Sequence, residues 1–94
     1  MFNLKKPTVQ LLGSWQPWQE EHTELFKEAI QTTGQVCLQI RDVHGIDDNQ
    51  FEFHTISSDI QWALKQEGYE HHIHYIIMQV PNVVDVVLEN EEEG

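Results

Sequence analysis

Short apolar runs with the period of a strand alternate along this chain with longer runs that have the period of a helix. The strand-like runs are TVQLLG (8–13), QVCLQIRD (35–42) and HIHYIIMQVPN (72–82), and the helix-like runs are HTELFKEAIQTTG (22–34) and HTISSDIQWALKQEG (54–68). Alternation over short connections predicts right-handed crossovers on a parallel sheet. The predicted fold class is therefore α/β, a small Rossmann-like βαβαβ unit with a parallel sheet, about half of a doubly wound fold.

The spacing of apolar residues predicts which faces are buried and where each element ends. Thr55 is the expected N-cap of the second helix, and Gly34 and Gly68 are the expected stops of the two helices. The run VVDVVL (83–88) is expected to form either a short fourth strand or an exposed edge that pairs with a partner. The residues expected to face the core are Leu25, Phe26, Ala29, Ile30, Val36, Leu38, Ile40, Ile56, Ile60, Ala63 and Leu64.

Length and charge limit the classes of partner. With 94 residues the chain is expected to form one domain over 1–88, followed by an acidic tail over 89–94. Sixteen Asp and Glu against five Lys and Arg give a net charge of −11, which repels nucleic acid and anionic membranes and attracts basic proteins. No apolar run is long enough to span a bilayer. We therefore expect no nucleic-acid or membrane partner, and a homo-oligomer or a protein complex.

The number of cysteines indicates the redox state of the compartment in which the chain is expected to work. Cys37 is the single cysteine, so the chain can form no internal disulfide, which favours a reducing, cytoplasmic setting. Because Cys37 lies within an apolar run, it is expected to be a buried, inert thiol.

The connection between the first predicted strand and the first predicted helix, GSWQPWQEEH (13–22), resembles the first loop of the nucleotidyltransferase superfamily of adenylyl- and cytidylyltransferases. That loop reads approximately G-R-x-Q-P-x-H-x-G-H and leads directly into a helix. The resemblance extends over most of residues 8–82. The residues that fall in register with the loop are Gly13, Gln16, Pro17 and His22.

Three positions depart from this HxGH-type motif. Gln19 stands where the family has its first histidine, Glu21 where it has a glycine, and Ser14 where it has an arginine. An amide cannot become cationic, and a carboxylate adds negative charge where the backbone would approach a phosphate. The family's second phosphate motif, with Ser/Thr and Arg, has no counterpart in these residues, so the resemblance is to a truncated and degenerate member.

The resemblance thus implies a nucleotidyltransferase-like domain that is non-catalytic and acts by binding a protein partner or a nucleotide. Gln19 and His22 are the vestigial catalytic candidates, and no cofactor is predicted unless nucleotide binding is retained, in which case Mg²⁺ with ATP or CTP is expected. The implied nucleotide-binding residues are Gly13, Ser14, Trp15, Gln16, Gln19, His22, Arg41 and Asp42.

Two other functions stay open. An active adenylyl- or cytidylyltransferase, completed by oligomerisation, would use Gln19 and His22 on the triphosphate with Mg²⁺, assisted by Arg41. An acidic mimic that blocks a basic site on another protein is the other alternative, and it rests on charge alone.

Several residues have both a functional and a packing interpretation. Trp15 and Trp18 could stack on a base or pack beside a tight proline turn. Arg41 and Asp42 could touch a ligand, or could form an ion pair or a turn cap.

Three histidines raise the question of a metal. If His72 and His74 lie on a strand they share a face and could offer two imidazoles to Zn²⁺, with His71 beside them. Spacing fixes no third or fourth ligand, so solvated histidines are the alternative and no metal site is predicted.

Overall fold

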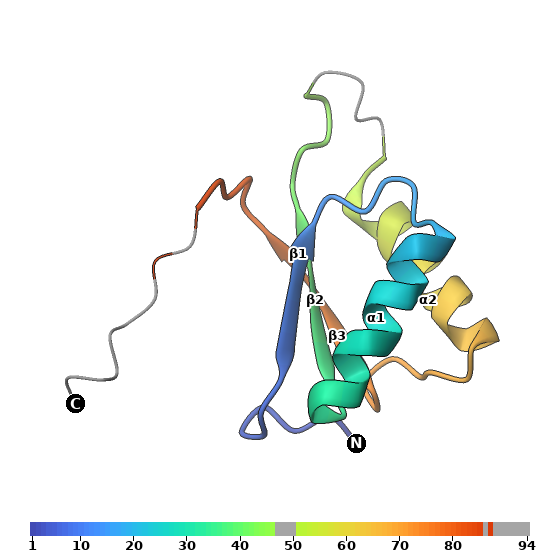
Figure 1. Ribbon diagram of the computed structural model, residues 1–94. Coiled ribbons are helices and arrows are strands. Elements are labelled where there is room, and N and C mark those ends of the chain that lie inside the picture. The colour runs from blue at the N-terminus through green and yellow to red at the C-terminus, as the bar shows by residue number, and fades with distance from the viewer. Residues whose placement is uncertain (47–50, 86, 88–94) are drawn as a thin grey trace.

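The computed structural model describes residues 1–46, 51–85 and 87 (Figure 1). It has the predicted alternation of strands and helices, and the α/β fold class is confirmed as a small Rossmann-like βαβαβ unit. The expected acidic tail (89–94), residues 47–50 and two positions of the 83–88 run lie outside the described residues. The elements are β1 (Val9–Gly13), α1 (Glu20–Thr33), β2 (Val36–Arg41), α2 (Phe53–Gln66) and β3 (Tyr75–Val80).

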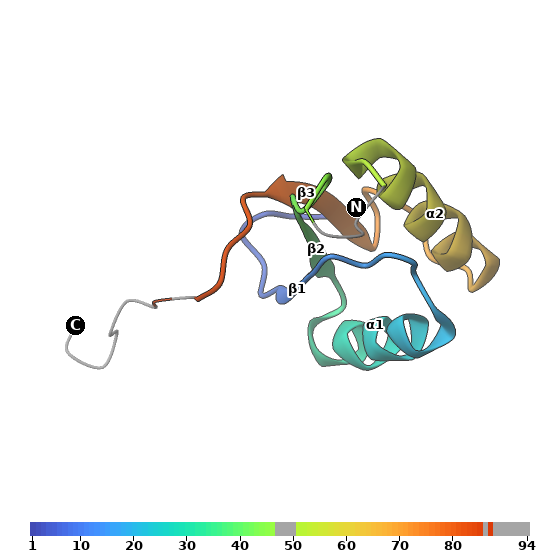
Figure 2. The same ribbon diagram turned by 90° about the horizontal axis from the view of Figure 1, so that it is seen from above.

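The three strands form one parallel sheet in the order β1-β2-β3. Val36 of β2 pairs with Val9 on one side and with Tyr75 on the other, which fixes the register of all three strands. Both helices lie on the same side of the sheet, and the opposite side carries no helix among the described residues (Figure 2). The carboxyl ends of the strands, where parallel sheets usually bind ligands, therefore meet at one edge.

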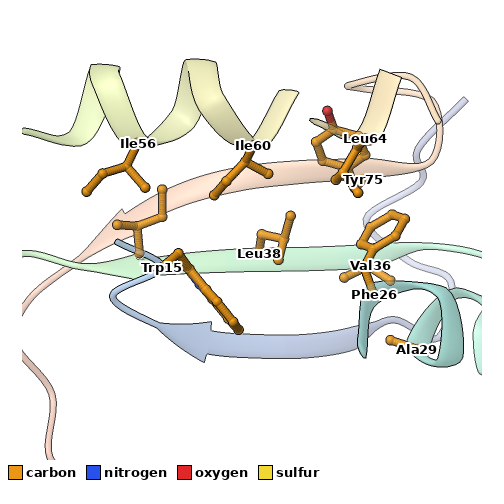
Figure 3. Packing of buried hydrophobic residues seen from close by; sticks show 10 residues of the cluster. Trp15, Phe26, Ala29, Val36, Leu38, Ile56, Ile60, Leu64 and Tyr75 are labelled. Atoms are coloured by element: carbon orange, nitrogen blue, oxygen red, sulfur yellow. The ribbon is translucent and has the colours of Figure 1, made fainter. Parts of the chain in front are cut away.

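The core lies between the sheet and the two helices. Val36, Leu38 and Ile40 of the central strand are buried, as their alternation predicts, and residues of both helices pack on them (Figure 3). The other core members are Trp15, Phe26, Ala29, Ile56, Ile60, Leu64 and Tyr75.

The predicted face of the first helix was partly wrong. The structure begins α1 at Glu20, with Gln19 as its N-cap. Leu25 is 42% exposed, whereas Thr23 is buried, because the inward stripe is centred on Phe26. The helix ends as predicted, since Gly34 takes φ 85° and donates its N–H to the Ile30 carbonyl.

Corrections also apply to the second helix. It begins at Phe53 with Glu52 as N-cap, so the expectation of Thr55 as the cap was wrong. Ile56, Ile60 and Leu64 are buried as predicted, whereas Ala63 is only half-buried.

The third strand is shorter than predicted. It begins at Tyr75, because a turn precedes it in which the His74 N–H donates to the Glu70 carbonyl at 2.9 Å. Val83 and Val84 form no strand with the described part of the sheet, so these residues do not show the expected fourth strand.

Gln10, Cys37, Gln39 and Met78 lie on the side of the sheet without helices, where they contact one another in pairs. Gln10 Nε2 donates to Gln39 Oε1 at 2.8 Å, and the Cys37 Sγ lies 3.6 Å from the Met78 Sδ. Cys37 is half-buried rather than buried, and burial raises the pKa of its thiol, which favours the unreactive protonated form.

Neither helix in the described ranges is long and apolar enough to cross a bilayer.

Candidate functional site

The loop that joins β1 to α1 turns sharply at Trp15, which has φ 54°, and continues through a cis peptide bond between Gln16 and Pro17. The indole of Trp15 folds back over the end of β1. A Cβ placed on Gly13 would lie 2.8 Å from Trp15 Cε2, closer than carbon atoms approach. The packing of Trp15 therefore requires glycine at position 13, and this requirement does not involve a ligand.

Three rings fill this loop, and we call Trp15, Trp18 and His22 the loop aromatic cluster. Ring centroids are 5.3 Å apart for the two tryptophans, 5.1 Å for Trp15 and His22, and 5.4 Å for Trp18 and His22. Trp15 is 8% exposed. Its Nε1–H donates to the Gln39 carbonyl at 3.0 Å, and the Trp18 Nε1–H donates to Thr23 Oγ1 at 2.9 Å. Both indoles are thus held as packing groups, as the packing interpretation of these residues requires.

The N-terminus of α1 satisfies two of its own N–H groups. The Gln19 N–H donates to His22 Nδ1 at 3.0 Å, and the His22 N–H donates to the Gln19 carbonyl at 2.9 Å. The first four N–H groups of a helix have no helical acceptor and are the usual anion ligands. Of these four groups, the N–H groups of Glu20 and Glu21 have no acceptor among the described residues. Only these two are therefore left to bind an anion at this end of α1.

Charge around the loop opposes an anion. Glu20 and Glu21 are exposed in the first turn of α1. The Lys27 Nζ, about two helical turns further on, lies 2.5 Å from Glu67 Oε1 and 3.3 Å from Glu24 Oε2. These bonds, first to Glu67 and then to Glu24, raise the pKa of Lys27. The charge of Lys27 is therefore already matched by two carboxylates.

A second set of predicted residues meets at the carboxyl end of β2. Gln16, Arg41 and Asp42 line a small cavity of about 10 Å³. The Gln16 Nε2 and the Arg41 Nε are buried and have no hydrogen-bond partner within the described residues. Such a volume suits about one water molecule, whereas ligand pockets measure about 300–1,000 Å³.

The remaining predicted residues have simple places. The Asp42 Oδ1 accepts the His44 N–H at 3.3 Å, so this carboxylate caps a turn. Ser14 is half-buried in the loop. The structure thus brings Gly13, Trp15, Gln19 and His22 together at one place and Gln16, Arg41 and Asp42 at another.

The third strand begins at Tyr75, so the expectation that His72 and His74 lie on it was wrong, and the zinc alternative loses its geometric basis. His72 has φ 71° and lies in the turn before β3. The His71 and His72 rings stack at 3.8 Å, and His74 Nδ1 accepts the Glu70 N–H at 2.9 Å. Within the described residues no group of three or more His, Cys, Asp or Glu side chains is arranged to hold a metal ion.

Sequence reasoning missed a hollow between the two helices. Trp62 of α2 lines it and is 69% exposed, and Trp18 lies at its other wall. The signal was present in the sequence, because Trp62 is two residues from Ile60 and so falls opposite the buried stripe of α2.

No protein-family model, no curated protein and no solved structure matches the chain.

Proposed function

We propose that this chain is a non-catalytic, nucleotidyltransferase-like binding domain that acts on a protein partner. The observation that carries the proposal is the loop aromatic cluster, Trp15, Trp18 and His22, which occupies the loop where such a fold would bind phosphates. A loop filled by its own side chains leaves a nucleotide little space, and two of the N–H groups at the start of α1 are already bonded within the protein.

Electrostatics support the same conclusion. Nucleotidyl transfer depends on positioned donors and cations that stabilise charge on the phosphates. Here His22 Nδ1 accepts a hydrogen bond from the backbone of Gln19, and two exposed carboxylates, Glu20 and Glu21, stand in the first helical turn. A triphosphate would have to displace the first contact and approach the second. Neither step is favourable.

A protein partner agrees with the charge of the chain. The net charge of −11 repels a polyanionic ligand and attracts a basic protein. The acidic-mimic function is a special case of this proposal, in which the bound partner is inhibited. Both predict an affinity that falls as salt is added.

One observation favours the nucleotide alternative. The buried donors Gln16 Nε2 and Arg41 Nε have no acceptor among the described residues, and anionic oxygens are suitable acceptors for such groups. The cavity that they line measures only about 10 Å³, so a nucleotide would need the loop to rearrange.

Calorimetric titration with ATP and with CTP, each with Mg²⁺, tests the proposal. We expect no saturable binding tighter than about 100 μM, which corresponds to ~5.5 kcal/mol. Tighter binding would contradict the proposal, and its loss in a His22→Ala variant would place the nucleotide at this loop. Release of pyrophosphate would establish the active transferase instead.

A further inference from the structure

A groove lies between α1 and α2, on the side of the molecule away from the sheet. Two adjoining hollows form it, of about 300 Å³ and about 240 Å³, and both are lined by Trp18, Trp62 and Ala63. We call it the interhelical groove. Its apolar lining residues are Pro17, Trp18, Trp62 and Ala63, and the carboxylates along it are Glu20, Glu24, Asp59 and Glu67.

The two tryptophans give the groove a rigid apolar wall. Trp18 is half-buried, and its bond to Thr23 Oγ1 fixes the indole in place. Trp62 stands on α2 with 69% of its surface exposed, although tryptophan is usually mostly buried. Large exposed aromatic side chains beside a hollow are typical of the centres of protein interfaces.

The charge of the groove specifies the chemistry of its occupant. Four carboxylates line it, against the single cation Lys27, which already contacts Glu24 and Glu67. Lysine and arginine pair with carboxylates, stack on indole faces and lay their apolar stems along such a surface. Nucleic acid and a second copy of this acidic chain would both meet like charge.

We propose that the interhelical groove is the docking site for a basic amphipathic segment of a partner protein. Its Lys or Arg side chains contact the rim at Glu20 and Asp59, and its apolar side chains pack against Trp18 and Trp62. The inference rests on the proposed function and deepens it, because it names the place and the chemical class of the partner.

A labelled synthetic peptide that combines lysine and leucine at helical spacing serves as the probe, and fluorescence anisotropy measures its affinity for the full chain. An acidic peptide with glutamate in place of each lysine is the matched negative probe. We expect saturable binding of the basic peptide alone, weakened by added salt.

Two variants locate the site. Trp62→Ala removes an exposed side chain, so the fold should be retained, and we expect an affinity at least about tenfold weaker. The combined variant Glu20→Gln, Glu24→Gln and Asp59→Asn should weaken binding several-fold. Its control removes the same amount of charge from glutamates 91–93, which lie outside the described residues, and should bind like the wild type.

The indole N–H signals in a proton–nitrogen NMR spectrum place the peptide independently. We expect those of Trp62 and Trp18 to shift on binding and that of Trp15 to stay. Unchanged affinity in Trp62→Ala, equal losses in the two charge variants, or self-association abolished by Trp62→Ala would each overturn the inference. None of these outcomes bears on nucleotide binding, so the proposed function would stand or fall separately by the ATP and CTP titrations.

Discussion

Two regions on either side of Trp18 use the same residue type in opposite ways. In the loop after β1, Trp15 is 8% exposed and its N–H is bonded to the Gln39 carbonyl. In the interhelical groove, Trp62 is 69% exposed. The two residues are of the same type, and burial and hydrogen bonding distinguish them. Trp15 is a packing residue that fills the loop, whereas Trp62 is available for contact with a partner.

The sequence drew attention to the loop, through its resemblance to a phosphate-binding motif, and not to the groove. The loop has residues that resemble a ligand site, yet His22 bonds to the Gln19 backbone and both indole N–H groups have acceptors within the protein. The groove has no recognisable motif, yet its apolar and charged side chains face outward.

The largest expected effect is on stability. Trp15→Ala should lower the free energy of unfolding by about 3–5 kcal/mol, because it removes a buried ring and leaves the Gln39 carbonyl without its donor. Trp62→Ala should change it by less than about 0.5 kcal/mol. Urea unfolding followed by circular dichroism measures both, and similar losses in the two variants would contradict the assignment of Trp15 to the core.

Gly13 should be needed only because of Trp15. Gly13→Ala should cost about 1–3 kcal/mol, since the added Cβ would lie 2.8 Å from Trp15 Cε2. In a Trp15→Leu background the same change should cost much less, and a double-mutant cycle measures the difference. Equal costs in both backgrounds would mean that the glycine serves some other purpose.

Most of the fold could be predicted from the sequence, because periodicity reports burial directly. Val36, Leu38 and Ile40 alternate in the central strand and are all buried. The errors lie where hydrogen bonds within a turn decide the outcome: the bond from His74 to Glu70 delays β3, and Glu52 rather than Thr55 precedes α2. Such hydrogen bonds do not change the spacing of apolar residues, so the sequence pattern does not reveal them.

Less of the site could be predicted. The sequence identifies the loop, but side-chain direction decides its use, and nothing in its spacing shows that the Trp15 indole folds over Gly13 or that His22 bonds to Gln19. Arg41 and Gln16 meet at a small cavity beside Ile40, at the end of β2, and no spacing in the sequence brings Gln16 there.

Tyr75 provides a smaller, pH-dependent test of the core beneath the helices. Burial, with the nearby Glu70 carboxylate second, raises the pKa of Tyr75 from 10.0 to about 12. The neutral phenol is favoured in the folded chain, so this stabilisation is complete below pH 10 and is lost as pH rises toward 12. Absorbance titration of the phenolates should show a late step that Tyr75→Phe removes; a wild type without that step would contradict its burial.

The smallest effect concerns His71. Burial first, and the neighbouring His72 second, lower the pKa of His71 from 6.5. The His71 side chain therefore binds a proton more readily in the unfolded chain than in the folded chain. The contribution of neutral His71 to the free energy of unfolding is present above pH 6.5 and is lost as pH falls below it. The loss in urea midpoint from about pH 7.5 to about pH 5.5 should be smaller in His71→Gln than in the wild type. An equal loss would mean that His71 titrates alike in both states.

The contrast between a closed loop and an open groove is tested most directly by following the three indole N–H signals while ATP and Mg²⁺ are added. We expect the signals of Trp15, Trp18 and Trp62 all to keep their positions up to roughly millimolar nucleotide. Saturable shifts at Trp15 and Trp18 would show that the loop admits phosphate, and would contradict the assignment of a closed loop.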